Sequence, residues 1–242
     1  MIFRFAPLLT VVLAFTSCEK AAAPAASPSL AQQDMPLLPV TPGDRWTYQV
    51  ELFIPAGVTS PSAAEVEQSY ERSRTYLGKM VPAKGLPEVD CFEIDVPGFP
   101  KEREFVEIHD DAILLRGSMT LREEATSPLW FSQPVPFLTA GLNAGDALPD
   151  VSAEAGGLSR KTQVEARETI SVLAGTFPCI RLRTTGMDGN IELSETLWFS
   201  PGTGIICGEK VRKRGDMILF REHQKLTAVR MEHRKSATPP SP

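Results

Sequence analysis

The sequence predicts a mainly β protein: a single domain of strongly curved antiparallel sheet, partial barrel or sandwich-like, with little helix. Polar and apolar residues alternate with a period of two along several segments. This pattern places one face of each strand against a core and the other in water. Turn residues separate these segments at short, regular intervals. About 200 residues of the chain are expected to fold, and a chain of that length can bury one sizeable core without a structural metal.

The clearest hairpin lies at residues 168–184. Residues 168–172 alternate between polar and apolar, and Ile180 and Leu182 share one face of the following strand. The short connection between them contains Gly175, where a positive φ costs little. This segment therefore predicts two paired strands, each with one buried face.

The domain opens at a Pro42-Gly43-Asp44 turn, after which a strand places Trp46, Tyr48, Val50 and Leu52 on one face. A hairpin is expected through the turn at residues 109–111. The other strands expected from the pattern are at 70–77, 89–96, 103–108, 112–117, 162–172, 177–185, 191–199, 204–211 and 217–231.

Residues 118–150 differ from the rest because they contain four prolines, which cannot donate to a strand ladder. A central strand is therefore not expected here. One interpretation is a strap whose aromatic residues plug one end of the sheet. The other is a lid over a cavity, which makes Trp130, Phe131 and Phe137 the candidate ligand-binding residues.

The N-terminus predicts export. A short basic start is followed by an apolar run too short to span a bilayer, and then by Thr16-Ser17-Cys18. This resembles the lipobox of bacterial lipoproteins, in which the signal is cut before the cysteine and Cys18 is lipidated; Phe15 departs from the usual Leu or Val. The alternative is an ordinary secretory signal without the lipid. By resemblance to Gram-negative sorting rules, Glu19 favours the outer membrane, facing the periplasm.

We divide the chain into four parts: a lipoprotein signal peptide at 1–17, a flexible Ala/Pro/Ser tether at 18–36, a β-rich domain at 37–234 and a disordered tail at 235–242. Removing residues 1–17, whose one charged side chain is Arg4, changes the formal net charge from −5 to −6. This acidity argues against nucleic acid as a partner. The membrane is the expected partner, through the N-terminal lipid.

Three cysteines remain after Cys18: Cys91, Cys179 and Cys207. They are either small buried residues or include a single disulfide whose pairing the sequence does not specify. The three histidines, His109, His223 and His233, have no zinc-like spacing. No serine-nucleophile motif is present either, so we expect no catalytic residues, no metal and no cofactor.

The segment from 209 to 235 contains nine Lys and Arg residues against four acidic ones. One interpretation is the solvated outer face of two strands, where cations also discourage edge pairing. The other is an anionic partner bound by Lys210, Arg212, Lys213 and Arg214.

Three motifs resemble one family of bacterial envelope proteins, often lipoproteins with a β-rich domain of unknown function. They begin at Pro42 (P-G-D-R-W-T-Y), Ala174 (A-G-T-F-P-C) and Leu197 (L-W-F-S-P-G-T-G-I-I), and Leu173 departs from the proline frequent before such turns. The resemblance spans roughly residues 38–230. It implies a curved sheet or partial barrel and supplies no catalytic residues.

These observations favour a membrane-anchored envelope lipoprotein that is not an enzyme. Its β scaffold would bind a lipophilic ligand or a protein or anionic partner in the envelope. The alternative is an envelope hydrolase, which would need a cluster of acid, base or nucleophile that the sequence does not display.

Overall fold

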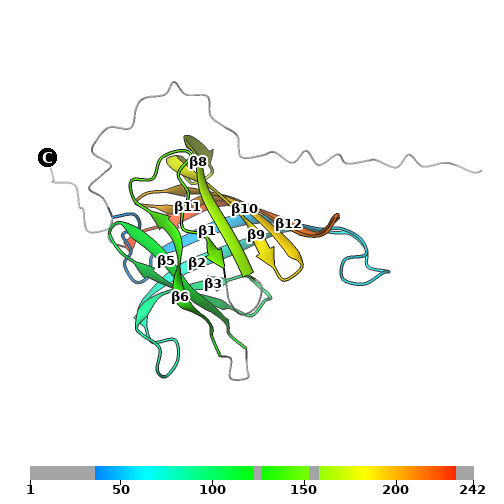
Figure 1. The fold of residues 1–242 in the computed structure, drawn as a ribbon, viewed down its shortest axis with the longest axis horizontal. Helices are drawn as coiled ribbons and strands as arrows, with labels where there is room; N and C mark the ends of the chain where they lie inside the picture. Colours follow the sequence, from blue (N-terminus) through cyan, green and yellow to red (C-terminus); the bar gives the residue numbers. More distant parts are fainter. Residues whose placement is uncertain (1–35, 123–126, 153–157, 233–242) are drawn as a thin grey trace, which may run out of the picture.

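The protein forms one antiparallel sheet that curls into a half-barrel (Figure 1). This computed structural model describes residues 36–122, 127–152 and 158–232. No α-helix occurs within these ranges, so the predicted mainly β, curved-sheet fold is confirmed. It follows that none of the described segments is a helix able to cross a membrane. The predicted signal peptide, Cys18, most of the tether and the predicted tail lie outside the described residues.

The sheet has twelve strands, of which β7 is only two residues long. Their bounds are β1 Arg45–Ile54, β2 Val66–Met80, β3 Val89–Asp95, β4 Glu102–Ile108, β5 Ala112–Thr120, β6 Leu129–Thr139, β7 Val151–Ser152, β8 Leu158–Val172, β9 Gly175–Asp188, β10 Ile191–Ser200, β11 Gly204–Arg214 and β12 Met217–Arg230.

Two meanders make up this sheet. Strands β1 to β6 follow one another on one side, and β7 to β12 follow one another on the other. The first and last full-length strands of the domain, β1 and β12, pair at the centre, with Arg45 opposite Arg230 and Phe53 opposite Arg221. That one long-range pairing joins the two halves, so it fixes the architecture.

Because neighbouring strands are antiparallel, the connections fall at two ends. The β1–β2, β3–β4, β5–β6, β7–β8, β9–β10 and β11–β12 connections share one end, which we call the open end. The other end, the closed end, holds the remaining connections and both ends of the described domain. There Leu37, Leu38 and Met231 are buried against the core. The indole Nε1 of Trp46 also donates to the carbonyl of Thr203 at 2.6 Å.

The core lies inside the curl. Trp46, Tyr48 and Val50 are 1%, 3% and 0% exposed, which confirms the predicted alternation in the first strand. Phe92 of β3 is fully buried and packs edge-on against Trp46, with ring centroids 5.9 Å apart. Leu182 of β9 faces the same interior, as the hairpin pattern predicted. This apolar burial, at about 25 cal/mol per Å², stabilises the curl.

Asp44 ties the two ends of the domain together at the closed end. Its side chain is fully buried and accepts hydrogen bonds from the backbone N–H of Thr41 at 2.8 Å and of Glu232 at 2.6 Å. The first bond holds the turn before β1, and the second holds the residue that follows β12. The predicted turn at Pro42–Asp44 therefore also fastens the C-terminal strand.

The prediction that residues 118–150 contain no central strand is confirmed, although an edge strand that was not predicted, β6, lies there. Proline removes a donor that a central strand needs, but β6 is an edge strand that pairs only with β5. Pro134 and Pro136 are therefore tolerated, and they protect this edge against further pairing. Gly117 of β5 permits the close approach, since a Cβ there would lie 2.1 Å from the Leu129 carbonyl oxygen.

The rest of that segment is a strap. Residues 140–150 run along the free edge of β8: Gly145 N–H donates to Val164 O at 2.8 Å and Leu148 N–H to Thr162 O at 2.9 Å. The strap leads from β6, at one edge of the sheet, to β7 at the other. It therefore crosses the gap in the half-barrel and covers a second exposed edge.

Candidate functional site

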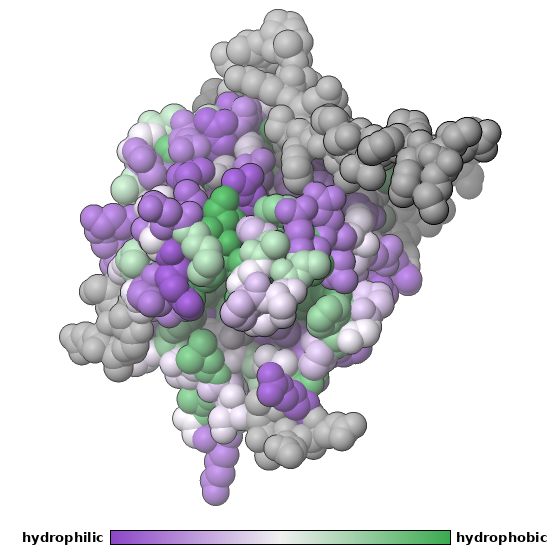
Figure 2. Space-filling view, turned by 90° about the vertical axis from the view of Figure 1, so that its right-hand side faces the viewer, coloured by the Kyte–Doolittle hydropathy of each residue, from purple (hydrophilic) through white to green (hydrophobic). Residues whose placement is uncertain are grey.

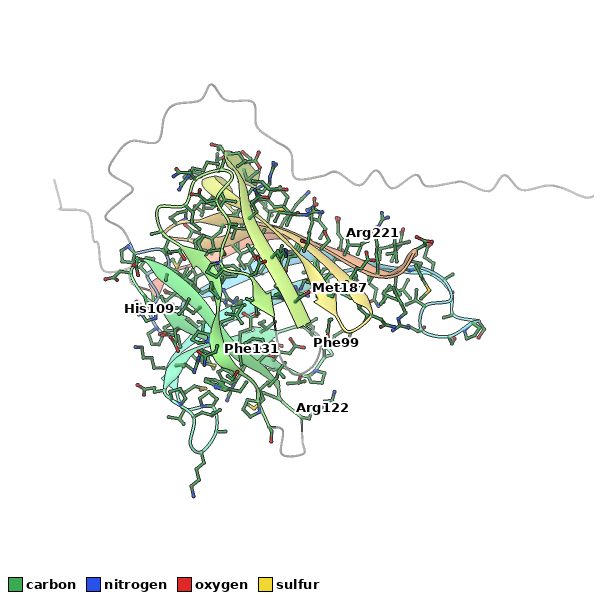
Figure 3. All side chains as sticks on the ribbon, viewed as in Figure 1. Phe99, His109, Arg122, Phe131, Met187 and Arg221 are labelled. Atoms are coloured by element: carbon green, nitrogen blue, oxygen red, sulfur yellow. The ribbon has the colours of Figure 1, made fainter. Side chains whose placement is uncertain are left out.

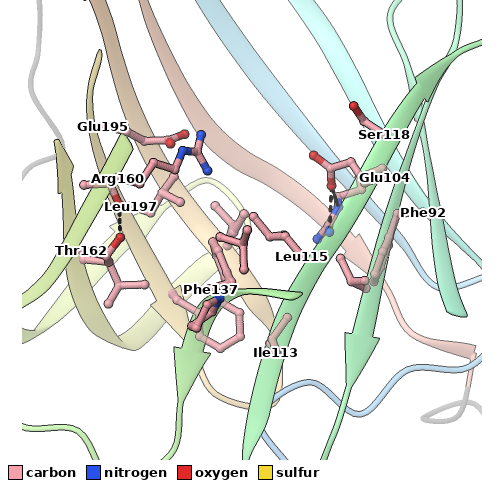
Figure 4. Close-up of a pocket in the computed structure, with 18 of the residues that line it drawn as sticks. Phe92, Glu104, Ile113, Leu115, Ser118, Phe137, Arg160, Thr162, Glu195 and Leu197 are labelled. Carbon is pink, nitrogen blue, oxygen red and sulfur yellow. Dashed lines mark hydrogen bonds and ion pairs between the residues drawn. The ribbon is translucent and has the colours of Figure 1, made fainter. Parts of the chain in front are cut away.

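The half-barrel encloses a cavity of about 320 Å³ that lies between the two meanders (Figure 4). The side chains that line it come from both halves of the sheet and from the segment before β1. Its two ends differ in character. The part toward the closed end is lined mainly by apolar residues, whereas the part toward the open end contains charged residues together with apolar ones such as Phe131.

The apolar part is formed where strands converge on the closed end. Leu38 precedes β1, Ile113 begins β5, and Phe137 and Phe199 end β6 and β10. Phe137 and Phe199 pack edge-on with ring centroids 6.1 Å apart, so they connect the edge strand β6 to β10 in the other half of the sheet. Tyr48 also lines this part and donates its hydroxyl to the Ile205 carbonyl at 3.1 Å. Burial raises the pKa of that phenol above its ordinary value.

The polar part contains a row of side chains fixed by strand register. Thr162, Thr184, Glu195, Lys210 and Glu222 are successive partners across β8 to β12. The hydroxyls of the two threonines lie 2.9 Å apart, and the Lys210 ammonium lies 3.8 Å from Glu195 and 3.9 Å from Glu222. Period-two alternation thus places one polar residue per strand at the same depth.

Arg72 of β2 reaches this row from the other half of the sheet. Its guanidinium donates to both oxygens of Glu222, at 2.9 and 2.7 Å, and to the amide oxygen of Gln224 at 3.1 Å. The two charged side chains are only 20% and 12% exposed. A bidentate pair of this kind is a strong charge-assisted contact and holds the two walls at a fixed spacing.

Two further cations line the cavity. Arg74 pairs with Glu104 at 3.0 Å and lies over the ring of Phe92, 3.7 Å from its centroid. Arg160, near the start of β8, points toward the cavity beside Glu195 (Figure 4). Its Nε is buried and has no hydrogen-bond partner among the residues that the structure describes. Arg160 therefore differs from Arg74, whose charge is matched by a carboxylate.

The three aromatic residues proposed from the sequence do not lie together. Phe131 and Phe137 line the cavity, toward the open and closed ends respectively. Trp130 is not among the lining residues: it packs against Phe105 at a centroid distance of 6.4 Å, with Arg116 over its ring. Adjacent residues of a strand face opposite ways, so Trp130 and Phe131 separate. Ligand binding by these residues stays a prediction.

The four basic residues proposed as one anionic-partner patch divide between two places. Lys210 lines the cavity wall and Arg212 is half-buried on the same strand. Lys213 and Arg214 are exposed where β11 ends. Binding of an anionic partner by this set stays a prediction.

The histidines lie away from the cavity lining. His109 sits in the β4–β5 turn, at the opposite end of the molecule from Phe99 and Met187 (Figure 3), and its Nε2 is 3.5 Å from Glu107. His223 lies 3.6 Å from Glu51. His233 lies outside the described residues. Within the described ranges, no cluster of His, Cys, Asp and Glu could hold a metal ion.

Cys91 and Cys179 are free and buried, so they are not paired with each other. Burial raises the pKa of the Cys91 thiol to about 11 and that of Cys179 to about 12. Cys207 is also buried, with its sulfur 3.5 Å from His223 Nε2. The sequence could not show this proximity, because the two residues come together only through the β11–β12 pairing.

We expect Cys91 and Cys179 to resist alkylation in the native protein. Only the thiolate reacts, and burial both disfavours the thiolate and blocks access. Labelling with iodoacetamide near pH 8 should be about a hundredfold slower at these two positions than in urea, and faster at higher pH. Peptide mass spectrometry would measure each site. Equal labelling rates in native buffer and in urea would contradict this burial.

Sequence reasoning missed Arg72, Arg160, Glu195 and Glu222 as site residues. The alternation around Arg160 and Thr162 indicates a strand with two faces, but both faces carry polar residues. Val164, two residues after Thr162, was the one clear sign that this face points inward, and it is fully buried. Figure 2 shows the side of the molecule where the β1–β2 and β11–β12 connections lie, with apolar residues in the middle ringed by hydrophilic ones.

No family model and no curated protein sequence matches this chain. Two similar solved structures are a provisionally described exported protein with a YmcC-like fold from Bacteroides fragilis and a provisionally described lipoprotein from Parabacteroides distasonis. They are 11% and 13% identical, each with a TM-score of 0.47, and each match covers 81% of this chain and 99% of the other. At these values neither structure assigns a residue role or a ligand here. The family resemblance noted in the sequence stays a prediction.

Proposed function

We propose that this protein is a lipid-anchored, non-catalytic binding protein of the bacterial envelope, whose half-barrel holds a lipophilic ligand. The observation that carries the proposal is the hollow interior. Small barrels are commonly filled by side chains, whereas this one retains about 320 Å³. Ligand sites typically measure about 300–1,000 Å³ and are mostly apolar with a few polar groups. This cavity fits that description.

The position of the chain ends supports the anchored arrangement. The described domain begins at Pro36, next to the buried Leu37 and Leu38 of the closed end. A tether from a lipidated Cys18 would join the domain there, which leaves the open end accessible. Lipidation of Cys18 is a prediction from the N-terminal sequence.

The test is binding of N-phenyl-1-naphthylamine, a neutral dye that brightens in apolar surroundings. The folded wild-type domain should bind the dye, and Leu115→Trp, which enlarges a cavity-lining side chain, should weaken binding about tenfold or more. Leu114→Trp is the matched control, because the neighbouring residue faces the other side of β5. Ser118→Trp, an exposed change at the cavity's open end, should also block the dye without disturbing the core.

Melting curves and circular dichroism would establish that each variant folds. Failure of the folded wild-type domain to bind the dye would overturn the proposal. So would equal binding by the Leu114, Leu115 and Ser118 variants, because the dye would then lie elsewhere.

A further inference from the structure

We infer that the ligand is a single-chain amphiphile with an anionic head group, and that Arg160 binds this head group. The inference rests on the proposed function, since it names the ligand class for the same cavity. Three features of the lining support it: an Arg160 donor that lacks a partner, an excess of positive charge, and a separation of polar and apolar ends.

Four described arginines have a buried Nε without a hydrogen-bond partner, and of these four only Arg160 lines the cavity. Its Nε is buried yet has no acceptor among the described residues. By contrast, Arg72, Arg74 and Lys210 all lie within ion-pair distance of a carboxylate. A buried donor left unpaired is costly, and a ligand oxygen would remove that cost. The planar guanidinium suits a carboxylate or phosphate, which it can bind through two hydrogen bonds.

The charges around Arg160 favour an anion. The residues that line the cavity include four cations and two carboxylates, and Glu222, which pairs with Arg72 and Lys210, adds a third carboxylate, so the formal charge is 4 − 3 = +1. Glu195 is the acid next to Arg160, and Lys210 partly neutralises it at 3.8 Å. A positive cleft with apolar walls concentrates anions.

The arrangement of the lining sets the orientation and size of the ligand. Arg160 is near the open end, whereas Ile113, Phe137 and Phe199 line the cavity toward the closed end. An anionic head at Arg160 therefore directs an alkyl chain toward these apolar residues. The volume of about 320 Å³ is at the small end for ligand sites, which favours one chain over a multi-chain lipid.

The inference can be tested by competition against bound N-phenyl-1-naphthylamine, with all competitors kept below micelle formation. Dodecanoate or dodecyl phosphate should displace the dye at a concentration about tenfold or more below that needed for dodecanol. The stronger of the two anions identifies the head group as carboxylate or phosphate. Arg160→Gln should remove most of the difference in displacing concentration between the anions and dodecanol. The dodecanol concentration that displaces the dye should stay within about twofold of the wild-type value. Arg160→Lys should retain part of the difference.

Lys161→Gln is the matched control, because Lys161 is adjacent in β8 but 75% exposed. The three competitors should displace the dye from this variant at the same concentrations as from the wild type. The inference is wrong if dodecanol displaces the dye at the same concentration as the anions, or if the anions displace the dye from Arg160→Gln at the wild-type concentration. Either result would leave the proposal of a lipophilic cavity unaffected. If the wild type does not bind the dye at all, the proposed function fails first, so the two failures are distinguishable.

Discussion

Replacing Arg72 with methionine is expected to lower the free energy of unfolding by about 3–5 kcal/mol, because it leaves the Glu222 carboxylate buried without its bidentate partner. The two side chains are 20% and 12% exposed, so solvent screens this pair only weakly. Urea denaturation followed by circular dichroism would measure the change. The double variant Arg72→Met/Glu222→Leu should recover most of the loss, since it removes both charges.

The exposed ion pair between Lys161 and Asp150 provides a control. Its partners lie 3.3 Å apart but are 75% and 62% exposed. Lys161→Met should therefore change stability by less than about 1 kcal/mol. An Arg72→Met effect as small as this control would show that the pair across the two halves is not a stabilising contact.

The pH dependence of the Arg72 effect follows from Glu222. Burial alone would raise the pKa of Glu222, but hydrogen bonds from Arg72 and the charges of Lys210 and Arg72 outweigh it, so the pKa lies below its ordinary value. The contribution is fully present above the unfolded pKa of about 4.3 and is lost as the pH falls through the lower folded pKa. The stability difference between wild type and Arg72→Met should therefore be full at about pH 7 and smaller at about pH 3.

Replacing Asp44 with alanine is the second change expected to have a large effect, about 3 kcal/mol or more. The substitution leaves the N–H groups of Thr41 and Glu232 without their acceptor, and each charge-assisted bond contributes about 1.5–3 kcal/mol. The loss of local stability should be largest at the closed end, where these two bonds lie. Hydrogen exchange would detect it as faster exchange at the starts of β1 and β11 and the end of β12 than elsewhere.

Asp146 provides a control with the same local turn. Its Oδ2 accepts from the N–H of Asn143 at 2.7 Å, three residues earlier, just as Asp44 Oδ2 accepts from Thr41. Asp146 is exposed and makes no second side-chain bond comparable to that with Glu232. Asp146→Ala should therefore cost about 1 kcal/mol or less. Equal losses for the two alanine variants would show that Asp44 does not join the chain ends.

The strands were predictable because their cause is local. At Trp46, Tyr48 and Val50, alternation alone identifies the buried face, and the Pro42–Asp44 turn marks where the strand begins. The hairpin at residues 168–184 combines alternation with a glycine turn in the same way. The absence of a central strand at residues 118–150 was also predicted correctly, but the edge strand β6 was not predicted. Strand β6 contains Pro134 and Pro136, which are compatible only with an edge, and the sequence does not show which strand is at an edge.

The cavity was less predictable because its residues meet only through long-range pairing. Arg72 and Glu222 are 150 positions apart, and they approach because β1 pairs with both β2 and β12. Trp130 and Phe131 are adjacent in the sequence, yet only Phe131 faces the cavity. If the register of β6 shifted by one residue, Trp130 would face the cavity and Phe131 would face away. Which of the two faces inward therefore depends on the pairing of the whole sheet.

The sequence by itself determined the mainly β class, most strands and their turns, and the prediction of an exported, lipid-anchored chain. These features depend on neighbouring residues: period-two burial, turn chemistry and a short N-terminal motif. Only the tertiary structure decided that β1 meets β12, that the sheet curls around a hollow interior, and that Arg160 points into it. Those features arise from strand pairing and packing between distant segments, where a cavity reflects the combined shape of many side chains rather than any one residue.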